Sequence, residues 1–331
     1  MTANISIIIP CFNEEDTIQL LLTALSEQTY PQKDMEIIIA DGMSQDNTRS
    51  EIKRFKVKHA DMNIRVIDNR IGNIPAALNT AIKAAKGDIF IRMDAHAIPQ
   101  ADYVERCVKA LQEGIGDNVG GVWDIHPRNE KWIARSIAVA AAHPLGVGDA
   151  QYRFTNEAAY VDTVPFGAFK RDLIDKIGPF DETLLSNEDY EFNTRIRESG
   201  GRIWLDPSIR SIYYARPNLD ELSRQYWRYG FWKAQMLKRY PKTLRLRQAI
   251  PPLFVLSLLI FAIAALLFPL AQWLMFSEAL LYILVLMGVG IQVAIKEKQF
   301  SMLFGVPLAI ATMHLNWGAG FIRGIFTRKS K

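Results

Sequence analysis

Two groups of polar side chains in this 331-residue sequence have the types and spacing of catalytic groups. In the first group, Asp94 and His96 are separated by one alanine and directly follow a short apolar stretch at 89–93. A carboxylate and an imidazole at this spacing could hold a divalent ion that bridges a diphosphate. Because so short a motif is common, the alternative is that Asp94 caps a turn and His96 is an ordinary loop histidine.

The second group is the adjacent acidic pair Glu188 and Asp189, at the start of an expected helix that Ser186 or Asn187 can cap. Acidic residues are favoured in a first helical turn by the helix dipole, which explains part of the pattern. If the pair faces a pocket, one carboxylate could act as a general base while the other keeps it oriented.

Alternating strands and helices over residues 5–94 are expected to position the first group. Apolar, β-branched runs at 5–10, 35–40, 64–67 and 88–93 predict buried strands, and amphipathic segments between them predict helices. This order favours a parallel α/β sheet, which binds ligands beyond the carboxyl ends of its strands. All four expected strand ends carry acidic or amide side chains, namely Asn13 and Glu14, Asp41 and Asp46, Asn69, and Asp94.

Composition and motifs exclude several classes of function. No Gly-x-Gly-x-x-Gly follows the first strand and no phosphate-binding Gly-x-x-x-x-Gly-Lys-Ser/Thr occurs, which argues against a dinucleotide dehydrogenase and a P-loop ATPase. A net charge of +4 is too small to indicate nucleic-acid binding. Cys11 and Cys107 match no metal or redox spacing, and the N-terminus has no signal segment, so we expect this part of the chain in the cytoplasm.

Two later segments leave alternatives open. Gly167, followed by Ala168, leaves space that suits the close approach of a ligand, although tight packing would need the same small residues. The expected helix 219–240 is rich in aromatic and basic residues, which is typical of an interfacial anchor. Gln225 and Arg228 on that helix could instead hold a diphosphate or an acceptor. The stretch 146–156 is expected to be a loop, either a lid or a surface excursion.

The C-terminal part of the chain has the composition of a membrane domain. Hydrophobic segments at 250–274, 279–295 and 302–322 approach the ~20 residues that a spanning helix needs. The positive-inside rule places the basic residues before 250 in the cytoplasm and a turn at 272–278 outside. A third span would put the basic tail (Arg323, Arg328, Lys329 and Lys331) outside, so a re-entrant or interfacial third segment is the alternative. We therefore expect a catalytic domain at 1–245 and a membrane domain at 246–331.

Six motifs in order resemble the family-2 inverting nucleotide-sugar glycosyltransferases with a GT-A fold. The branch most similar is the membrane-attached exopolysaccharide type, as in the succinoglycan glucosyltransferases, and the resemblance covers about residues 4–240. The motifs are Ile-Ile-Ile-Pro-Cys-Phe-Asn-Glu-Glu at 7–15, Asp41-Gly42-x-Ser44-x-Asp46-x-Thr48, Asn69-x-x-Gly72 with Ala77-x-Asn79, Asp94-x-His96, Glu188-Asp189, and Gln225-x-x-Arg228-Tyr229.

This resemblance implies a fold and a role for each matched position. The fold would be α/β, a Rossmann-like, mostly parallel GT-A sheet followed by transmembrane helices. Asp94 and His96 would correspond to the Asp-x-Asp element, which binds Mn²⁺ or Mg²⁺ and the donor diphosphate. Asp189 would be the catalytic base, with Glu188 beside it. Residues that would hold the nucleotide are Pro10, Phe12, Glu14, Asp41, Asn69 and Asp94, and those near the diphosphate or acceptor are Gly167, Gln225 and Arg228.

Two departures from the family pattern stand out. His96 replaces the usual aspartate, which leaves the metal and the dependence on it open, although imidazole is a good ligand for Mn²⁺. Tyr229 replaces a tryptophan and the hydrophobic tail is short, which argues against a processive synthase with its own channel.

The resemblance also implies an activity. The enzyme would move a sugar from a nucleotide sugar, expected to be a UDP-sugar, to a lipid-linked saccharide in exopolysaccharide or cell-surface glycan synthesis. It would be a multi-pass protein of the inner membrane with a cytoplasmic catalytic domain, and other polysaccharide-synthesis proteins are candidate partners. The alternatives are a polyprenyl-phosphate sugar transferase and a non-catalytic scaffold that binds nucleotide sugars.

Overall fold

The structure is a computed structural model that describes residues 4–327, so Arg328, Lys329 and Lys331 of the topology argument lie outside the described residues. Its contacts group the chain into two compact units, and both are discontinuous in sequence. The first holds residues up to Asp124 together with Phe154–Tyr213, and the second holds Ile125–Arg153 and the chain from Tyr214 onward. The expected division into a catalytic and a membrane domain at residue 245 stays a prediction.

Four parallel strands form one half of the sheet in the first unit, in the order β3-β2-β1-β4. Their register brings Cys11 opposite Asp41, and Asp41 opposite Asp68, so these strands end at one sheet edge. The predicted alternation of strands and helices is confirmed, with boundaries within two residues of those expected. The strands are β1 (Ile5–Cys11), β2 (Met35–Asp41), β3 (Asn63–Asp68) and β4 (Ile89–Arg92).

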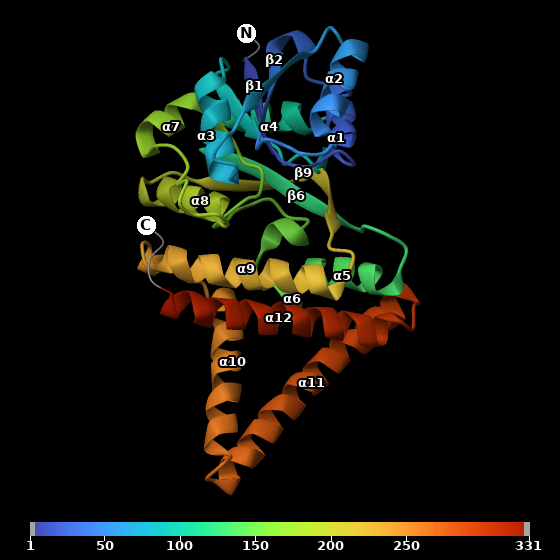
Figure 1. Cartoon of the computed structure of the whole chain (residues 1–331), viewed down its shortest axis with the longest axis vertical. Helices are drawn as coiled ribbons and strands as arrows, with labels where there is room; N and C mark the ends of the chain where they lie inside the picture. The colour runs from blue at the N-terminus through green and yellow to red at the C-terminus, as the bar shows by residue number, and fades with distance from the viewer. Residues whose placement is uncertain (1–3, 328–331) are drawn as a thin grey trace. The chain divides into compact units, whose positions relative to one another are not determined.

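Helices cover both faces of this sheet (Figure 1). The apolar side chains of three of them join the strands in one buried cluster, from α1 (Ile18–Ser26), α2 (Thr48–Lys58) and α4 (Tyr103–Gln112). On the other face, Phe90 of β4 contacts Phe169, which packs in turn against Phe192. That face is covered by α3 (Ile74–Ala84), α7 (Arg171–Ile177) and α8 (Glu188–Glu198).

The sheet continues beyond β4 with antiparallel pairing, because β8 runs against both β4 and β6. Gly121 of β6 lies so close to β9 that a Cβ atom there would be 1.8 Å from the carbonyl oxygen of Ile209. The strands are β5 (Ile98–Pro99), β6 (Asn118–Pro127), β7 (Ala159–Tyr160), β8 (Ala168–Lys170) and β9 (Ile203–Ala215), and η1 (Gln32–Asp34) is a short 3₁₀ turn before β2.

The second unit is helical, and α12 packs along α9 and α5 within it (Figure 1). Glycines allow this close approach, since a Cβ atom at Gly230 or Gly320 would lie 2.1 Å from a carbonyl oxygen of the facing helix. The helices are α5 (Trp132–Ala142), α6 (Pro144–Val147), α9 (Leu219–Leu237), α10 (Leu246–Ala264), α11 (Pro269–Glu297) and α12 (Met302–Phe326), with short turns η2 (Gln151–Arg153) and η3 (Pro241–Thr243). The expected loop 146–156 therefore contains the end of α6 and all of η2.

Among the described residues, α10 and α11 are long and apolar enough to cross a membrane, which indicates membrane association. The turn expected at 272–278 was placed wrongly: the chain turns between Ala264 and Pro269, because proline favours the first position of a helix. The third predicted segment corresponds to α12, which is not apolar enough to count as a membrane-crossing helix by this criterion. His314 and Asn316 make it more polar, and one of its faces is buried against α9.

Changing Gly121 to alanine should destabilise the protein by about 1–3 kcal/mol, because the new methyl group would force β6 and β9 apart. Gly288 of α11 is the matched control, since a Cβ atom there meets nothing within 4 Å and alanine favours a helix. Thermal unfolding of the full chain in detergent should show a lower Tm for Gly121→Ala only. Equal melting temperatures for the two variants would contradict this packing.

Candidate active site

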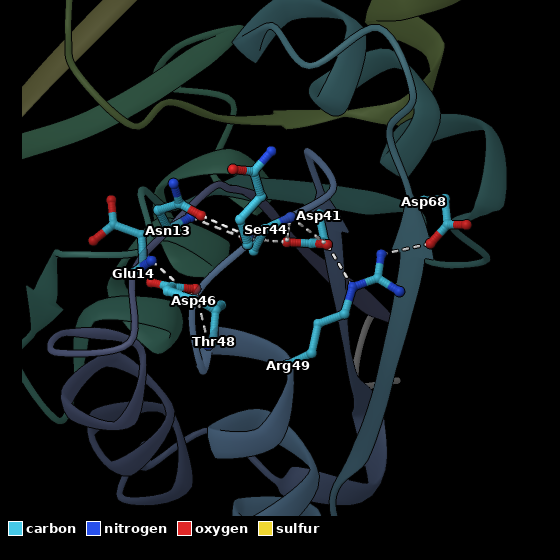
Figure 2. A network of polar contacts seen from close by, with 9 residues as sticks. Asn13, Glu14, Asp41, Ser44, Asp46, Thr48, Arg49 and Asp68 are labelled. Carbon is cyan, nitrogen blue, oxygen red and sulfur yellow. Dashed lines mark hydrogen bonds and ion pairs between the residues drawn. The ribbon is translucent and has the colours of Figure 1, made fainter.

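The loop after β1 is tied to the loop after β2 by hydrogen bonds that run in both directions (Figure 2). The backbone nitrogen of Asn13 donates to Ser44 Oγ at 2.9 Å, and the backbone nitrogen of Gln45 donates to Asn13 Oδ1 at 2.8 Å. Glu14 N donates to Thr48 Oγ1 at 2.7 Å. Asn13 has a φ of 53°, a left-handed conformation that asparagine tolerates. These bonds hold the first two strand ends as one rigid rim.

Asp41 is fully buried at this rim and is held by a cation and a hydroxyl group. Arg49 Nε lies 2.5 Å from Asp41 Oδ2, and Arg49 Nη2 lies 2.6 Å from Asp68 Oδ1 (Figure 2). Ser44 Oγ donates to Asp41 Oδ1 at 2.5 Å. The hydrogen bond from Arg49 lowers the pKa of Asp68. One guanidinium therefore pairs with carboxylates at the ends of two neighbouring strands and holds these ends together.

Pro10, Phe12 and Asn69, which were also predicted to bind the nucleotide, lie at the same rim but differ in their exposure to solvent. Pro10 is buried within β1, whereas Phe12 is 50% exposed and lies beside Gly42. Asn69 is buried and uses its side chain on its own turn, with Nδ2 donating to Asn73 O at 2.9 Å and Oδ1 accepting from Gly72 N at 3.3 Å. Phe12 thus presents an aromatic surface, and Asn69 fixes the loop after β3.

His96 is paired with a carboxylate from the first strand end. Its Nδ1 lies 3.0 Å from Glu14 Oε1, and Thr17 Oγ1 donates to Glu14 Oε2. A carboxylate on one ring nitrogen holds an imidazole in the tautomer whose other nitrogen carries the lone pair. The structure therefore brings Glu14 and His96 together, although the sequence motifs assigned them to different parts of the donor.

Asp94 is linked to the acidic pair of α8 by a buried arginine. Arg92, the last residue of β4, is 5% exposed, and its Nη2 lies 3.1 Å from Asp94 Oδ1 and 2.8 Å from Glu188 Oε1. Glu188 is itself 5% exposed. The guanidinium is thus the contact between the end of β4 and the start of α8.

Asp189 lies in a position that disfavours its charge. Its pKa is raised from 3.8 to about 6, first by burial and then by the neighbouring charge of Glu188, while Arg92 acts in the opposite direction. Its Oδ1 accepts a hydrogen bond from the Tyr190 amide at 2.7 Å. Asp189 keeps some contact with solvent, yet protein surrounds it closely enough for burial to dominate. A carboxylate with this pKa is ionised at neutral pH and is a stronger base than an exposed one.

The space beside Gly167 is filled by a side chain. A Cβ atom at Gly167 would lie 2.1 Å from Asn118 Oδ1, so the glycine makes room for the Asn118 amide. Asn118 Nδ2 donates to Asn193 Oδ1 at 2.6 Å, and Asn193 Nδ2 donates to Thr163 Oγ1 at 2.9 Å. Tight packing therefore accounts for this glycine, and a contact with the acceptor stays a prediction.

Gln225 and Arg228 lie on α9, in the second unit. Gln225 is buried and donates to Tyr229 Oη at 2.9 Å, whereas Arg228 is exposed. The Gln-x-x-Arg-Tyr motif thus places a tyrosine one turn from the glutamine, where it receives a hydrogen bond. A role for Gln225 and Arg228 toward a diphosphate or acceptor stays a prediction.

The family of the protein follows from sequence comparison. Residues 6–178, more than half of the chain, match the model of Glycosyl transferase family 2. A protein of Methanococcus voltae, described as a dolichyl N-acetyl-alpha-D-glucosaminyl phosphate 3-beta-D-2,3-diacetamido-2,3-dideoxy-beta-D-glucuronosyltransferase, is 30% identical over 98% of this chain and 98% of its own length. The chain belongs to glycosyl transferase family 2.

Two further comparisons agree with this assignment. The succinoglycan biosynthesis protein ExoA of Rhizobium meliloti is 29% identical to this family-2 glycosyltransferase over 96% of the chain and 93% of its own length. A mannosyltransferase of Pyrobaculum calidifontis, solved with GDP-Man and Mn²⁺, aligns with a TM-score of 0.62 at 22% identity, over 95% of this chain and 87% of that one. The α/β GT-A fold and the family resemblance predicted from the sequence are confirmed.

The motifs did not reveal three residues of this glycosyltransferase that organise the site: Arg49, Arg92 and Asn118. A signal for Arg92 was present, because a lone arginine ends the otherwise apolar strand Ile89–Arg92. Its partner Glu188 lies 96 positions later, however, and no local spacing could have joined the two.

Asp189→Asn should stabilise the folded glycosyltransferase at pH 8 by about 3 kcal/mol, because it removes a charge from a position that disfavours it. The folded pKa of Asp189 lies above the unfolded value, so this cost appears as pH rises from about 4 through about 6. Thermal melting should therefore show a higher Tm for the variant at pH 8 and little difference at pH 4.5. The exposed Asp61→Asn is the control, and an equal gain for Asp61→Asn would contradict the interpretation.

Proposed function

We propose that this glycosyltransferase is an inverting enzyme that moves a sugar from a nucleotide sugar to a hydroxyl group of a lipid-linked saccharide, with Asp189 as its base. The observation that carries the proposal is the raised pKa of Asp189, beside a cluster in which Arg92 joins Asp94 to Glu188. The chain thus has one carboxylate, Asp189, suited to accept a proton, and a second carboxylate, Asp94, placed to bind the nucleotide-sugar donor.

The reaction is a single displacement. The Asp189 carboxylate takes the proton of the acceptor hydroxyl as that oxygen attacks the anomeric carbon. The bond between this carbon and the diphosphate breaks, and the nucleoside diphosphate leaves with the bonding electrons. Because attack and departure occur on opposite faces, the anomeric configuration inverts. Glu188, fixed by Arg92 at 2.8 Å, keeps the start of α8 in place during the transfer.

The donor set at the end of β4 fits a divalent ion that is shared with the substrate. Within residues 4–327, no three His, Cys, Asp or Glu side chains converge on one point, so Asp94 and His96 would be joined by phosphate oxygens and water. When bound, Mn²⁺ or Mg²⁺ would supply positive charge to the departing diphosphate. Glu14 orients the His96 ring for this role, as the contact at 3.0 Å indicates.

The nucleotide is proposed to bind at the rim formed by the first three strand ends. Phe12 offers a half-exposed ring on which a base such as uracil could stack. Asp41 is fixed by Arg49 and Ser44, and Asn69 holds the loop after β3, so both position the rim that meets the nucleoside. Pro10 supports Phe12 from the end of β1. These roles, and UDP as the nucleotide, follow the family pattern.

The acceptor is proposed to reach the enzyme from a membrane. Helices α10 and α11 would insert as a hairpin, so the chain would be a multi-pass protein of the inner membrane with its catalytic domain in the cytoplasm. The relatives named for a dolichyl-linked substrate and for succinoglycan synthesis support a lipid-linked saccharide as the acceptor. Gln225 and Arg228 on α9 are candidates to contact it, and other polysaccharide-synthesis proteins are candidate partners.

Membranes that contain the full chain should release a nucleoside diphosphate from one member of a panel of UDP- and GDP-sugars when lipid extract is added. Asp189→Asn should lower this rate at least about 100-fold, because the acceptor loses its base. The rate with the wild-type chain should rise as pH increases through about 6, because only the ionised form of Asp189 accepts a proton. Asp61→Asn should keep the wild-type rate.

Other outcomes of this experiment separate the alternatives. Transfer to a lipid phosphate that carries no sugar would indicate a polyprenyl-phosphate sugar transferase. Full release by Asp189→Asn would remove Asp189 as the base, and no release from any donor would favour a scaffold that only binds nucleotide sugars.

His96→Ala should weaken the binding of Mn²⁺ in the presence of UDP by about 10-fold or more, whereas His96→Asp should retain it, because both aspartate and histidine coordinate this ion. Glu14→Gln should give a smaller loss, since it changes only the support of the ring. Titration calorimetry on the full chain in detergent measures this directly. Equal Mn²⁺ affinity in His96→Ala and wild type would remove His96 as a ligand.

A further inference from the structure

We propose that Arg92 is a positioning residue for the transfer reaction, one that fixes the base Asp189 and the donor-side Asp94 relative to each other. The inference rests on the proposed function and adds a residue to its machinery. It starts from the position of Arg92 at the end of β4, where the chain passes directly into Asp94.

The first observation is the geometry of the guanidinium. Its Nη2 is shared between Asp94 Oδ1 at 3.1 Å and Glu188 Oε1 at 2.8 Å, and its Nε donates to the same Asp94 oxygen at 3.4 Å. The guanidinium thus bridges the loop after β4 and the first residue of α8. Because a guanidinium is planar and its donors are fixed in direction, two such bonds define both a distance and an orientation. A lysine ammonium keeps the charge, but it has no fixed fork with which to hold both partners.

The second observation is a small cavity that Arg92 lines together with Asp189. The cavity has a volume of about 10 Å³, roughly the space of one water molecule, and Asn118, Gly167 and Asn193 also border it. Because Arg92 and Asp189 border the same small space, the positive charge of Arg92 acts on the Asp189 carboxylate across it.

Two polar atoms at this cavity indicate that it is more than a packing defect. Among the described residues, Arg92 Nη1 and Asn118 Oδ1 are buried and have no hydrogen-bond partner. The orientation of the Asn118 side chain follows from that of Asn193. Because Asn193 Nδ2 donates to the Val164 carbonyl, Asn193 Oδ1 must be the atom that accepts from Asn118 Nδ2. An unpaired donor and an unpaired acceptor thus belong to two residues that line this cavity together with Asp189.

Charge balance gives Arg92 a task that an apolar residue could not perform. Glu188 is almost fully buried, and Asp189 and Asp94 lie close to it, so three carboxylates share one cation. Without the guanidinium, the start of α8 would carry uncompensated negative charge next to Asp94, and Glu188 and Asp94 would move apart toward water. Asp189 follows Glu188 in the same helix and would move with it.

The test compares Arg92→Lys and Arg92→Met with the wild-type full chain in detergent, using the sugar nucleotide that supports transfer. The number of folded molecules is counted from the cooperative thermal unfolding signal of the purified chain, so kcat refers to folded enzyme only. We expect kcat to fall about 10-fold in Arg92→Lys and about 100-fold in Arg92→Met, because small displacements of a reacting group are costly. The KM for the donor should stay within about threefold of wild type.

The control is Arg65→Met, which breaks a comparable ion pair with the buried Glu36, 2.8 Å away at the opposite end of the strands. It should lower the Tm and leave kcat of the folded enzyme within about twofold of wild type. Arg92→Lys decides the outcome if Arg92→Met fails to fold. A kcat within threefold of wild type in folded Arg92→Lys and any folded Arg92→Met would overturn the assignment of Arg92.

The failure of this inference can be told from the failure of the proposed function. If wild type transfers sugar and Asp189→Asn does not, unchanged kcat in the Arg92 variants refutes only the role of Arg92. If the wild-type chain transfers from no donor, the proposed function falls and the role of Arg92 falls with it.

Discussion

Repulsion between carboxylates is the constraint on which the rest of this site depends. A parallel sheet directs its strand ends to one edge, and here those ends carry Asp41, Asp68 and Asp94, with Glu188 and Asp189 added by α8. Two arginines offset this repulsion, because each forms ion pairs with two carboxylates from different parts of the chain. Arg49 joins β2 to β3, and Arg92 joins β4 to α8. The cations thus fix the geometry of the edge as well as its charge.

Close packing around Asp189, the proposed base, is a second feature of the site. Gly167 lacks a side chain, so the Asn118 amide occupies the place beside it and joins Asn193 in a buried network. Phe169 and Phe192 close the same region on its apolar side. Burial in this region raises the pKa of Asp189, which suits its carboxylate to the proposed role of base near neutral pH.

Features that depend on neighbours in sequence could be predicted. The strands 5–10 and 35–40 are continuous apolar runs, the Asp94–His96 motif follows one of them, and Glu188–Asp189 begins a helix whose start is marked locally. The predicted position of the turn between α10 and α11 was wrong, because the polar residues Gln272, Ser277 and Glu278 lie within α11. The turn itself is apolar, and only Pro269 marks the start of the next helix. The packing of α12 on α9 was also missed, since it depends on glycines of both helices that meet only in the fold.

The pairing of Glu14 with His96 and of Arg92 with Glu188 shows the same limit at the site. Each partner is visible in the sequence, but their contact joins positions 82 and 96 residues apart. The family resemblance assigned Glu14 to the nucleotide site and His96 to the metal site. Only the arrangement of the strand ends shows that the Glu14 carboxylate contacts the His96 ring.

Inverting transfer by a single displacement is the central claim, and the stereochemistry of the product tests it most directly. The measurement is the proton NMR coupling constant of the anomeric proton in the product formed from a nucleotide donor with an α-linked sugar. A β-linked product from the wild-type chain is the predicted result. An α-linked product would show retention, and it would contradict a mechanism in which Asp189 activates the acceptor for one direct displacement.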